Sequence, residues 1–206
     1  MATNDYHFIT EWRVQGTAQE VADILDDAAG LTRWWPSVYL DVKVLEKGDE
    51  AGLGKVVDLY TKGWLPYTLR WQFRVTEVRD DGFTLIAQGD FEGRGIWTFK
   101  QEGPWVNVIY DWKISAEKPL LRYFSFLMKP IFSANHRWAM AKGEESLILE
   151  LERQHAKTEQ ARAQVPAPPQ ATRTSVPLVM SAVATIAAVA GLGFLFRKVR
   201  SSREYL

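Results

Sequence analysis

The chain has 206 residues, and its 25 Lys and Arg residues balance its 25 Asp and Glu residues, so the formal net charge is zero. With no stripe of basic residues before residue 197, this balance argues against a surface for nucleic acid. There is no cysteine, which excludes disulfides, thiolate metal sites and cysteine nucleophiles.

The N-terminal segment predicts one strand followed by short helices. Residues 6–15 alternate apolar and polar side chains, as a half-buried strand does. Thr17 and Glu20 form a capping box that starts a short helix over residues 21–29. This helical region ends before Pro36, which disfavours the helical conformation in the residue that precedes it.

A series of strands without intervening helices follows. Turn residues at 80–82, 92–93 and 103–104 separate the later ones. In the first strand of this series, we expect Val38, Leu40, Val42 and Val44 on one face because they alternate with other residues. The predicted strands are 37–46, 54–62, 67–78, 82–90, 94–101 and 104–114.

The pattern becomes helical after the last strand. Residues 119–130 are apolar nearly all round, and Pro130 starts or kinks the main helix, which continues to His155. The order of strand, short helices, antiparallel meander and long C-terminal helix predicts an α+β fold over residues 1–157.

The C-terminal segments differ from this domain in composition. Residues 158–175 form a polar, Pro-rich linker with too few apolar residues to pack. Residues 176–196 carry no charge and as a helix would span about 30 Å, which predicts a single-pass transmembrane helix. Residues 197–206 form a basic tail. Small residues spaced by four in the span permit self-association, although such spacing is common by chance.

Two rules disagree about the orientation of this span. The basic tail favours a cytoplasmic C-terminus. The N-terminus has no basic and apolar regions of the kind that make a signal peptide, so export of the domain has no visible signal. We therefore expect a membrane protein whose domain lies on the cytoplasmic side.

The predicted architecture implies a cavity. One helix is about 10 Å wide, whereas six or seven strands span about 30 Å, so the sheet must curl around the helix to bury its apolar face. Space left between them would be an apolar pocket, unless the large rings fill it. The candidate ligand-binding residues are Trp71, Phe73, Phe83, Trp97, Phe99, Tyr110, Trp112, Phe124, Met128 and Phe132.

The turn Trp64-Leu65-Pro66 is unusually apolar, since exposed turns prefer small polar residues. It lies at the end of the meander that also receives the apolar start of the long helix. We expect Trp64, Leu65 and Pro66 to form a portal to the pocket, with an inward-folded Trp64 plug as the alternative.

Two stretches of the sequence resemble a known family. "LTRWWPSVYLDVKVL" and "FSANHRWAMAKGEESL", with the order of elements, are similar to the START-like or SRPBCC superfamily, in particular its polyketide cyclase/dehydrase and lipid transport branch. The resemblance covers residues 5–155 and implies a helix-grip fold with a deep hydrophobic cavity. It does not imply one activity, since members include lipid carriers, hormone receptors, cyclases and aromatic oxygenase subunits.

Few residues suggest catalysis. The three histidines, His7, His136 and His155, are not spaced as metal ligands, and we expect no metal and no cofactor. The weak catalytic candidates are Tyr60, Tyr110 and His136, although a single helical histidine beside an arginine is more often a surface residue.

These observations predict membrane-tethered binding or transfer of a hydrophobic ligand, namely a lipid, an isoprenoid or a polyketide-like molecule. An enzyme of the cyclase or dehydratase type, acting on a ligand in the same cavity, is the alternative. A structural or interaction protein with a filled core is the third possibility.

Overall fold

The computed structural model describes residues 5–116 and 119–172, without the side chains of residues 116–128. The compact unit that contains the domain extends to Thr172. The predicted span at 176–196 and the basic tail at 197–206 lie outside the described residues. None of the helices in the described part is long and apolar enough to cross a membrane.

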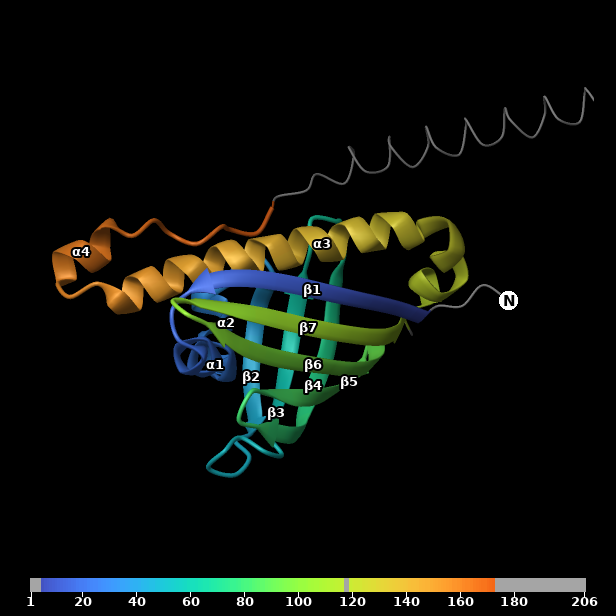
Figure 1. The fold of residues 1–206 in the computed structure, drawn as a ribbon. Coiled ribbons are helices and arrows are strands. Elements are labelled where there is room, and N and C mark those ends of the chain that lie inside the picture. Colours follow the sequence, from blue (N-terminus) through green and yellow to red (C-terminus); the bar gives the residue numbers. More distant parts are fainter. Residues whose placement is uncertain (1–4, 117–118, 173–206) are drawn as a thin grey trace, which may run out of the picture. The chain divides into compact units, whose positions relative to one another are not determined.

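One seven-stranded antiparallel sheet forms most of the domain (Figure 1). Its order is β1-β7-β6-β5-β4-β3-β2, so β2 to β7 form a meander and β1 pairs with β7 at the other edge. The strands are β1 (Asp5–Gln15), β2 (Tyr39–Glu46), β3 (Val56–Lys62), β4 (Thr68–Arg79), β5 (Gly82–Gly89), β6 (Phe91–Glu102) and β7 (Trp105–Ala116).

The sheet curls around one long helix, α3 (Pro119–His155), which contains Pro130 in its interior (Figure 1). Between β1 and β2 lie α1 (Ala18–Asp26), the 3₁₀ helix η1 (Ala28–Gly30) and α2 (Leu31–Trp34). The curved sheet around a long helix confirms the predicted α+β, helix-grip architecture of the domain.

Strand alternation places the core as the sequence predicts in β4 and β7. Trp71 and Val75 of β4 are buried, and Phe73 between them packs against the same core. On β7, Val106 and Val108 are almost completely buried. The apolar face of each strand therefore points toward α3, which contributes Leu147 and Leu151 to the same core, with at most 2 % of their surface exposed.

The predicted inner face of β2 is correct for Val38 and Val42, which pack against the core, and wrong for Leu40 and Val44. The pairing of β2 with β3 shifts register between Tyr39 and Asp41, so Leu40 is an extra, bulged residue. A bulge of one residue reverses the alternation of side chains along the strand. Tyr39 and Val42 consequently pack against the core, while Leu40 is 38 % and Val44 is 40 % exposed.

The chain after α3 is attached to the domain. It forms a short helix, α4 (Glu159–Gln164), and then runs back along α3 (Figure 1). Arg153 Nη2 donates to the carbonyl oxygen of Pro166 at 3.0 Å, and Lys62 Nζ donates to the carbonyl oxygen of Thr172 at 2.9 Å. Where the sequence suggests a linker that does not pack, residues 159–172 thus have contacts at both ends.

Candidate functional site

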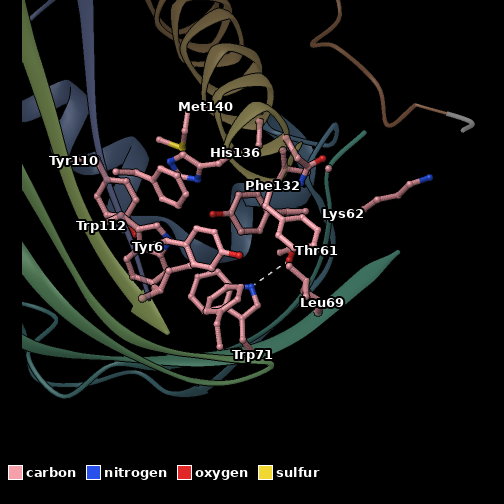
Figure 2. A pocket seen from close by; sticks show the side chains of 18 of the residues that line it. Tyr6, Thr61, Lys62, Leu69, Trp71, Tyr110, Trp112, Phe132, His136 and Met140 are labelled. Carbon is pink, nitrogen blue, oxygen red and sulfur yellow. Dashed lines mark hydrogen bonds between the residues drawn. The ribbon is translucent and has the colours of Figure 1, made fainter. Parts of the chain in front are cut away.

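Two cavities lie inside the domain. The larger of these two, of about 160 Å³, is bordered mainly by β1, β3, β4, β7 and α3, and the smaller one, of about 70 Å³, lies toward α1 and α2. Figure 2 shows side chains from the strands and from α3 converging on the larger cavity. Its lining residues are Tyr6, Phe8, Trp35, Val38, Tyr39, Thr61, Lys62, Gly63, Tyr67, Leu69, Trp71, Phe91, Tyr110, Trp112, Ile114, Phe132, Asn135, His136, Ala139 and Met140.

A partition of side chains separates the two cavities. Trp35, Tyr39, Trp71, Tyr110 and Met140 border both of them. The large rings therefore neither fill the interior nor leave one continuous trough, because they divide the space into two parts. Movement of this partition would join the two cavities.

The absence of a side chain at Gly95 makes room for the rings of Tyr110 and Trp112 on the inner face of the sheet. A methyl group on Gly95 would lie 2.7 Å from the Tyr110 hydroxyl and 2.9 Å from the Trp112 ring. Without that methyl group, Tyr110 lies across β6 and stacks on Trp97, with 4.0 Å between ring centroids, and on Trp112, at 5.4 Å. The glycine thus lets three rings cover the sheet without projecting further toward α3.

Two polar side chains in the wall form a hydrogen bond with each other. Trp71 Nε1 donates to Thr61 Oγ1 at 3.1 Å, the dashed line in Figure 2. The Thr61 hydroxyl in turn donates to the carbonyl oxygen of Leu69 at 3.4 Å. The N–H of Trp71 and the O–H of Thr61 are both used in these bonds, so neither is a free donor to the cavity.

His136 has a different environment. It lies on the α3 side of the cavity (Figure 2). Its ring stacks on Phe8 of β1, with 4.1 Å between ring centroids. Its Nε2 is buried and has no hydrogen-bond partner. Burial, with a smaller contribution from the charge of Arg137, lowers the pKa of His136 to about 4. The imidazole is therefore neutral near pH 7.

Tyrosine hydroxyls are further polar groups of the wall. Burial raises the pKa of Tyr39, and it raises that of Tyr110 well above its ordinary value, with Tyr39 as the smaller cause. Burial and the nearby Tyr6 raise the pKa of Tyr67. These phenols stay protonated at neutral pH, so they can donate a hydrogen bond but do not supply a negative charge.

The β3–β4 turn is held against α3 by Asn135. The side-chain oxygen Oδ1 of Asn135 accepts a hydrogen bond from the backbone N–H of Leu65 at 3.1 Å. A methyl group on Gly63 would overlap the Asn135 amide, so only glycine allows this close approach. Leu65 is consequently buried, with 5 % of its surface exposed.

Comparisons with known structures show the same fold in other proteins. TTHA0849 from Thermus thermophilus matches with a TM-score of 0.60 and 17% identity, over 71% of this chain and 99% of that chain. The Zhui aromatase/cyclase from Streptomyces sp. R1128 matches with a TM-score of 0.59 and 15% identity, over 73% and 95%. A START superfamily protein from Mycobacterium smegmatis matches with 0.54 and 14%, over 68% and 98%.

The chain has the START-like fold. These neighbours confirm the fold that the resemblance implied, and their identities, below 25%, carry nothing beyond the fold. No family model matches the sequence, and no curated protein matches it.

The START-like domain distributes the predicted ligand-binding residues over both cavities. Trp112 and Phe132 border the larger one, whereas Phe73, Phe83 and Trp97 border the smaller one. Trp71 and Tyr110 border both. Phe99 is buried in the core but borders neither. The side chains of Phe124 and Met128 lie outside the described part of the chain.

The portal residues and catalytic candidates are also divided. Trp64, Leu65 and Pro66 do not line the larger cavity, although their neighbours Lys62, Gly63 and Tyr67 do. Tyr60 lies away from it, beneath the guanidinium of Arg70, 5.2 Å from the ring centroid. Tyr110 and His136 do line the cavity. His136, for which the sequence favours a surface position, is half-buried and borders the cavity.

Sequence reasoning missed several wall residues of the START-like domain. Tyr6 and Phe8 share the alternation of Trp12 and Val14 on β1, so the strand pattern could have identified them. The bulge in β2 reverses the alternation of side chains there, so the strand pattern did not identify Tyr39. In the described part of the chain no group of three or more His, Cys, Asp or Glu residues could hold a metal ion.

Proposed function

We propose that the domain binds a compact hydrophobic ligand in the larger cavity. The observation that carries this proposal is the cavity itself, about 160 Å³ between the sheet and α3, with walls formed mainly by aromatic and aliphatic side chains. An apolar cavity of about 150 Å³ in another protein is large enough to bind benzene. The volume therefore suits a ligand of one ring.

Among the three ligand classes considered from the sequence, this volume favours a ring-shaped, polyketide-like molecule over a long-chain lipid. Binding sites for drug-sized ligands usually measure about 300–1,000 Å³. An isoprenoid or lipid would require the partition of Trp35, Tyr39, Trp71, Tyr110 and Met140 to move and join the two cavities. One structural neighbour is an aromatase/cyclase by name, which supports the same choice.

Filling the cavity tests the proposal. Ala139 lines the larger cavity, and Ala139→Phe would place a ring there. The full-length protein would be purified, extracted with organic solvent and analysed by mass spectrometry, and titrated with toluene. We expect wild type to retain or bind a small apolar ligand and Ala139→Phe to lose at least about nine-tenths of that binding.

Ala141→Phe is the matched control, because Ala141 is exposed on the same helix. It should bind as wild type does. Equal binding by wild type and Ala139→Phe, or no binding by wild type, would contradict the proposal.

We propose further that residues 176–196 tether the domain to a membrane, with the domain on the cytoplasmic side. The support is the length of this uncharged segment, about 30 Å as a helix. Tethering would raise the concentration of the domain near a membrane-dissolved ligand without any added contact. The full-length chain should remain in membranes after alkaline extraction, and a chain ending at residue 175 should be released; release of both would refute the tether.

An enzyme of the cyclase or dehydratase type is the second candidate, because Tyr110 and the neutral imidazole of His136 border the same cavity. In such a reaction the imidazole would accept a proton from the carbon next to a ketone, and a tyrosine hydroxyl would donate to the enolate oxygen. Exchange of the methyl protons of acetophenone in D₂O, followed by NMR, tests this step. The same rate with wild type, with His136→Leu and without protein would rule it out.

A further inference from the structure

The larger cavity is lined by a histidine whose hydrogen bonding the described residues leave incomplete. His136 Nε2 is buried and has no partner among the described residues, although the other face of the ring is supported by Phe8. The indole Nε1 of Trp35, whose ring borders both cavities, is likewise buried without a partner. A buried nitrogen left without a hydrogen bond costs free energy, so such an atom beside a cavity suggests a group that completes it.

The charges around His136 restrict what that group can be. Among the described residues, the lining of the larger cavity includes no Asp or Glu, and its charged member, Lys62, donates to the carbonyl oxygen of Thr172. The nearby charge that affects His136 is the positive charge of Arg137 on the same helix. No carboxylate of the lining stabilises an imidazolium, so the nitrogen needs a neutral partner.

We propose that the ligand carries a hydroxyl group on a ring, and that this hydroxyl hydrogen-bonds to Nε2 of His136. The inference rests on the proposed function, because it names the ligand class for the same cavity. A hydroxyl suits either tautomer of the imidazole: it donates to a bare Nε2 and accepts from a protonated one. A hydrocarbon leaves the nitrogen unpaired, and an anion would remain uncompensated among apolar walls.

The walls favour a ring as the carrier of this hydroxyl. Phe8 stacks on His136, and Tyr110 and Trp112, which also line this cavity, stack on each other on the sheet. Aromatic faces at these positions offer offset or edge contacts to a further ring. The ligand class is therefore a phenol or a comparable enolic ring, of one-ring size in the conformation seen here.

Phenol and toluene test this inference, since they have nearly the same shape and differ by a hydroxyl in place of a methyl group. Both would be titrated into the full-length protein, with binding followed from the protein's NMR signals and the free probe concentration measured in the same sample. We expect the ratio Kd(toluene)/Kd(phenol) to fall about five- to tenfold in His136→Leu, because a neutral hydrogen bond is worth a factor of that order. The ¹⁵N shift of Nε2 should change with phenol and not with toluene.

Two further variants make the result specific. His136→Gln keeps a hydrogen-bonding group near the same place and should restore part of the preference for phenol. His7→Phe is the control, because His7 lies on the exposed face of β1, where it pairs with Asp111, and it does not line the cavity. It should leave the ratio unchanged.

The possible results distinguish a failure of the hydroxyl inference from a failure of the cavity proposal. Binding of both probes with an unchanged ratio in His136→Leu would overturn the hydroxyl inference and leave the cavity proposal standing. If neither probe binds to wild type, the cavity proposal itself fails. A fallen ratio with toluene binding retained supports the inference, and it shows in addition that His136→Leu is folded.

Discussion

At the scale of single residues, the shape of the cavity depends on the absence of a side chain at position 95. Gly95 does not have a positive φ, so backbone conformation does not demand glycine there. What demands it is the Tyr110 ring, whose hydroxyl and Cε2 would lie 2.7 and 2.8 Å from an added methyl carbon. Such distances are too short for carbon in contact with oxygen or carbon, so the rings would have to move toward α3.

Gly95→Ala should therefore destabilise the protein and reduce the cavity. We expect a loss of about 1–3 kcal/mol in the free energy of unfolding, the usual cost of overpacking, together with weaker binding of toluene. Urea denaturation and the titration described above would measure both. In a Tyr110→Leu background the added methyl group has more room, so the cost of Gly95→Ala should fall; an equal cost in both backgrounds would show that the ring is not what excludes alanine.

Residue patterns in the sequence predicted some of these positions and not others. Trp71 and Phe73 follow an unbroken alternation, so period two was sufficient to place them on the inner face of β4. The position of His136 depends instead on helical spacing, since Phe132, His136 and Met140 are four residues apart and share one face of α3. Treating His136 as a single polar residue ignored its apolar neighbours on that face.

At the scale of elements, the start of α1 and the end of α3 meet through one carboxylate. Glu20 Oε2 accepts from the backbone N–H of Thr17 at 2.7 Å, and its Oε1 lies 2.9 Å from His155 Nε2. The sequence predicted the capping box from local spacing. It could not predict the contact with His155, which is 135 residues away in the chain and depends on how α3 crosses the sheet.

This contact predicts a dependence of stability on acid pH. The backbone hydrogen bond from Thr17, followed by the contact with His155, lowers the pKa of Glu20 below its ordinary value of 4.5. A carboxyl group whose pKa is lower in the folded state stabilises the fold above its unfolded pKa, and this stabilisation is lost as the pH falls through the folded pKa. The difference in unfolding free energy between wild type and Glu20→Gln should thus shrink as the pH falls below about 4.5.

Urea denaturation at a series of pH values would measure that difference. Thr17→Ala provides a comparison, because it removes the capping hydroxyl and should cost about 1 kcal/mol while leaving the carboxylate in place. A difference between wild type and Glu20→Gln that stays the same from about pH 6 to about pH 3 would show that the folded pKa is not lowered.

At the scale of the whole molecule, the sequence predicted the fold but could not predict the size of its interior space. The number of strands and the single long helix require a curled sheet, which the structure confirms. The volume that remains depends on the rotamers of rings such as Trp35 and Tyr110, which close the space between the two cavities. Alternation of aromatic residues is the same in a solid core and in a cavity wall, so the sequence pattern could not predict the volume of the cavities.

Attachment of residues 159–172 to the domain leads to a prediction at the same scale. Lys62 borders the larger cavity and donates to the carbonyl oxygen of Thr172, so the end of the described chain lies beside the cavity. Lys62→Met keeps much of the aliphatic length and removes the donor. We expect amide hydrogen exchange in residues 167–172 to become about two- to tenfold faster, because one hydrogen bond of ordinary strength is lost.

Lys100→Met is the control, since Lys100 is exposed and pairs with Glu102 on β6. Exchange that is equally fast in wild type and Lys62→Met would mean that the connector is held by its other contacts, such as that of Arg153 with Pro166, and not by Lys62.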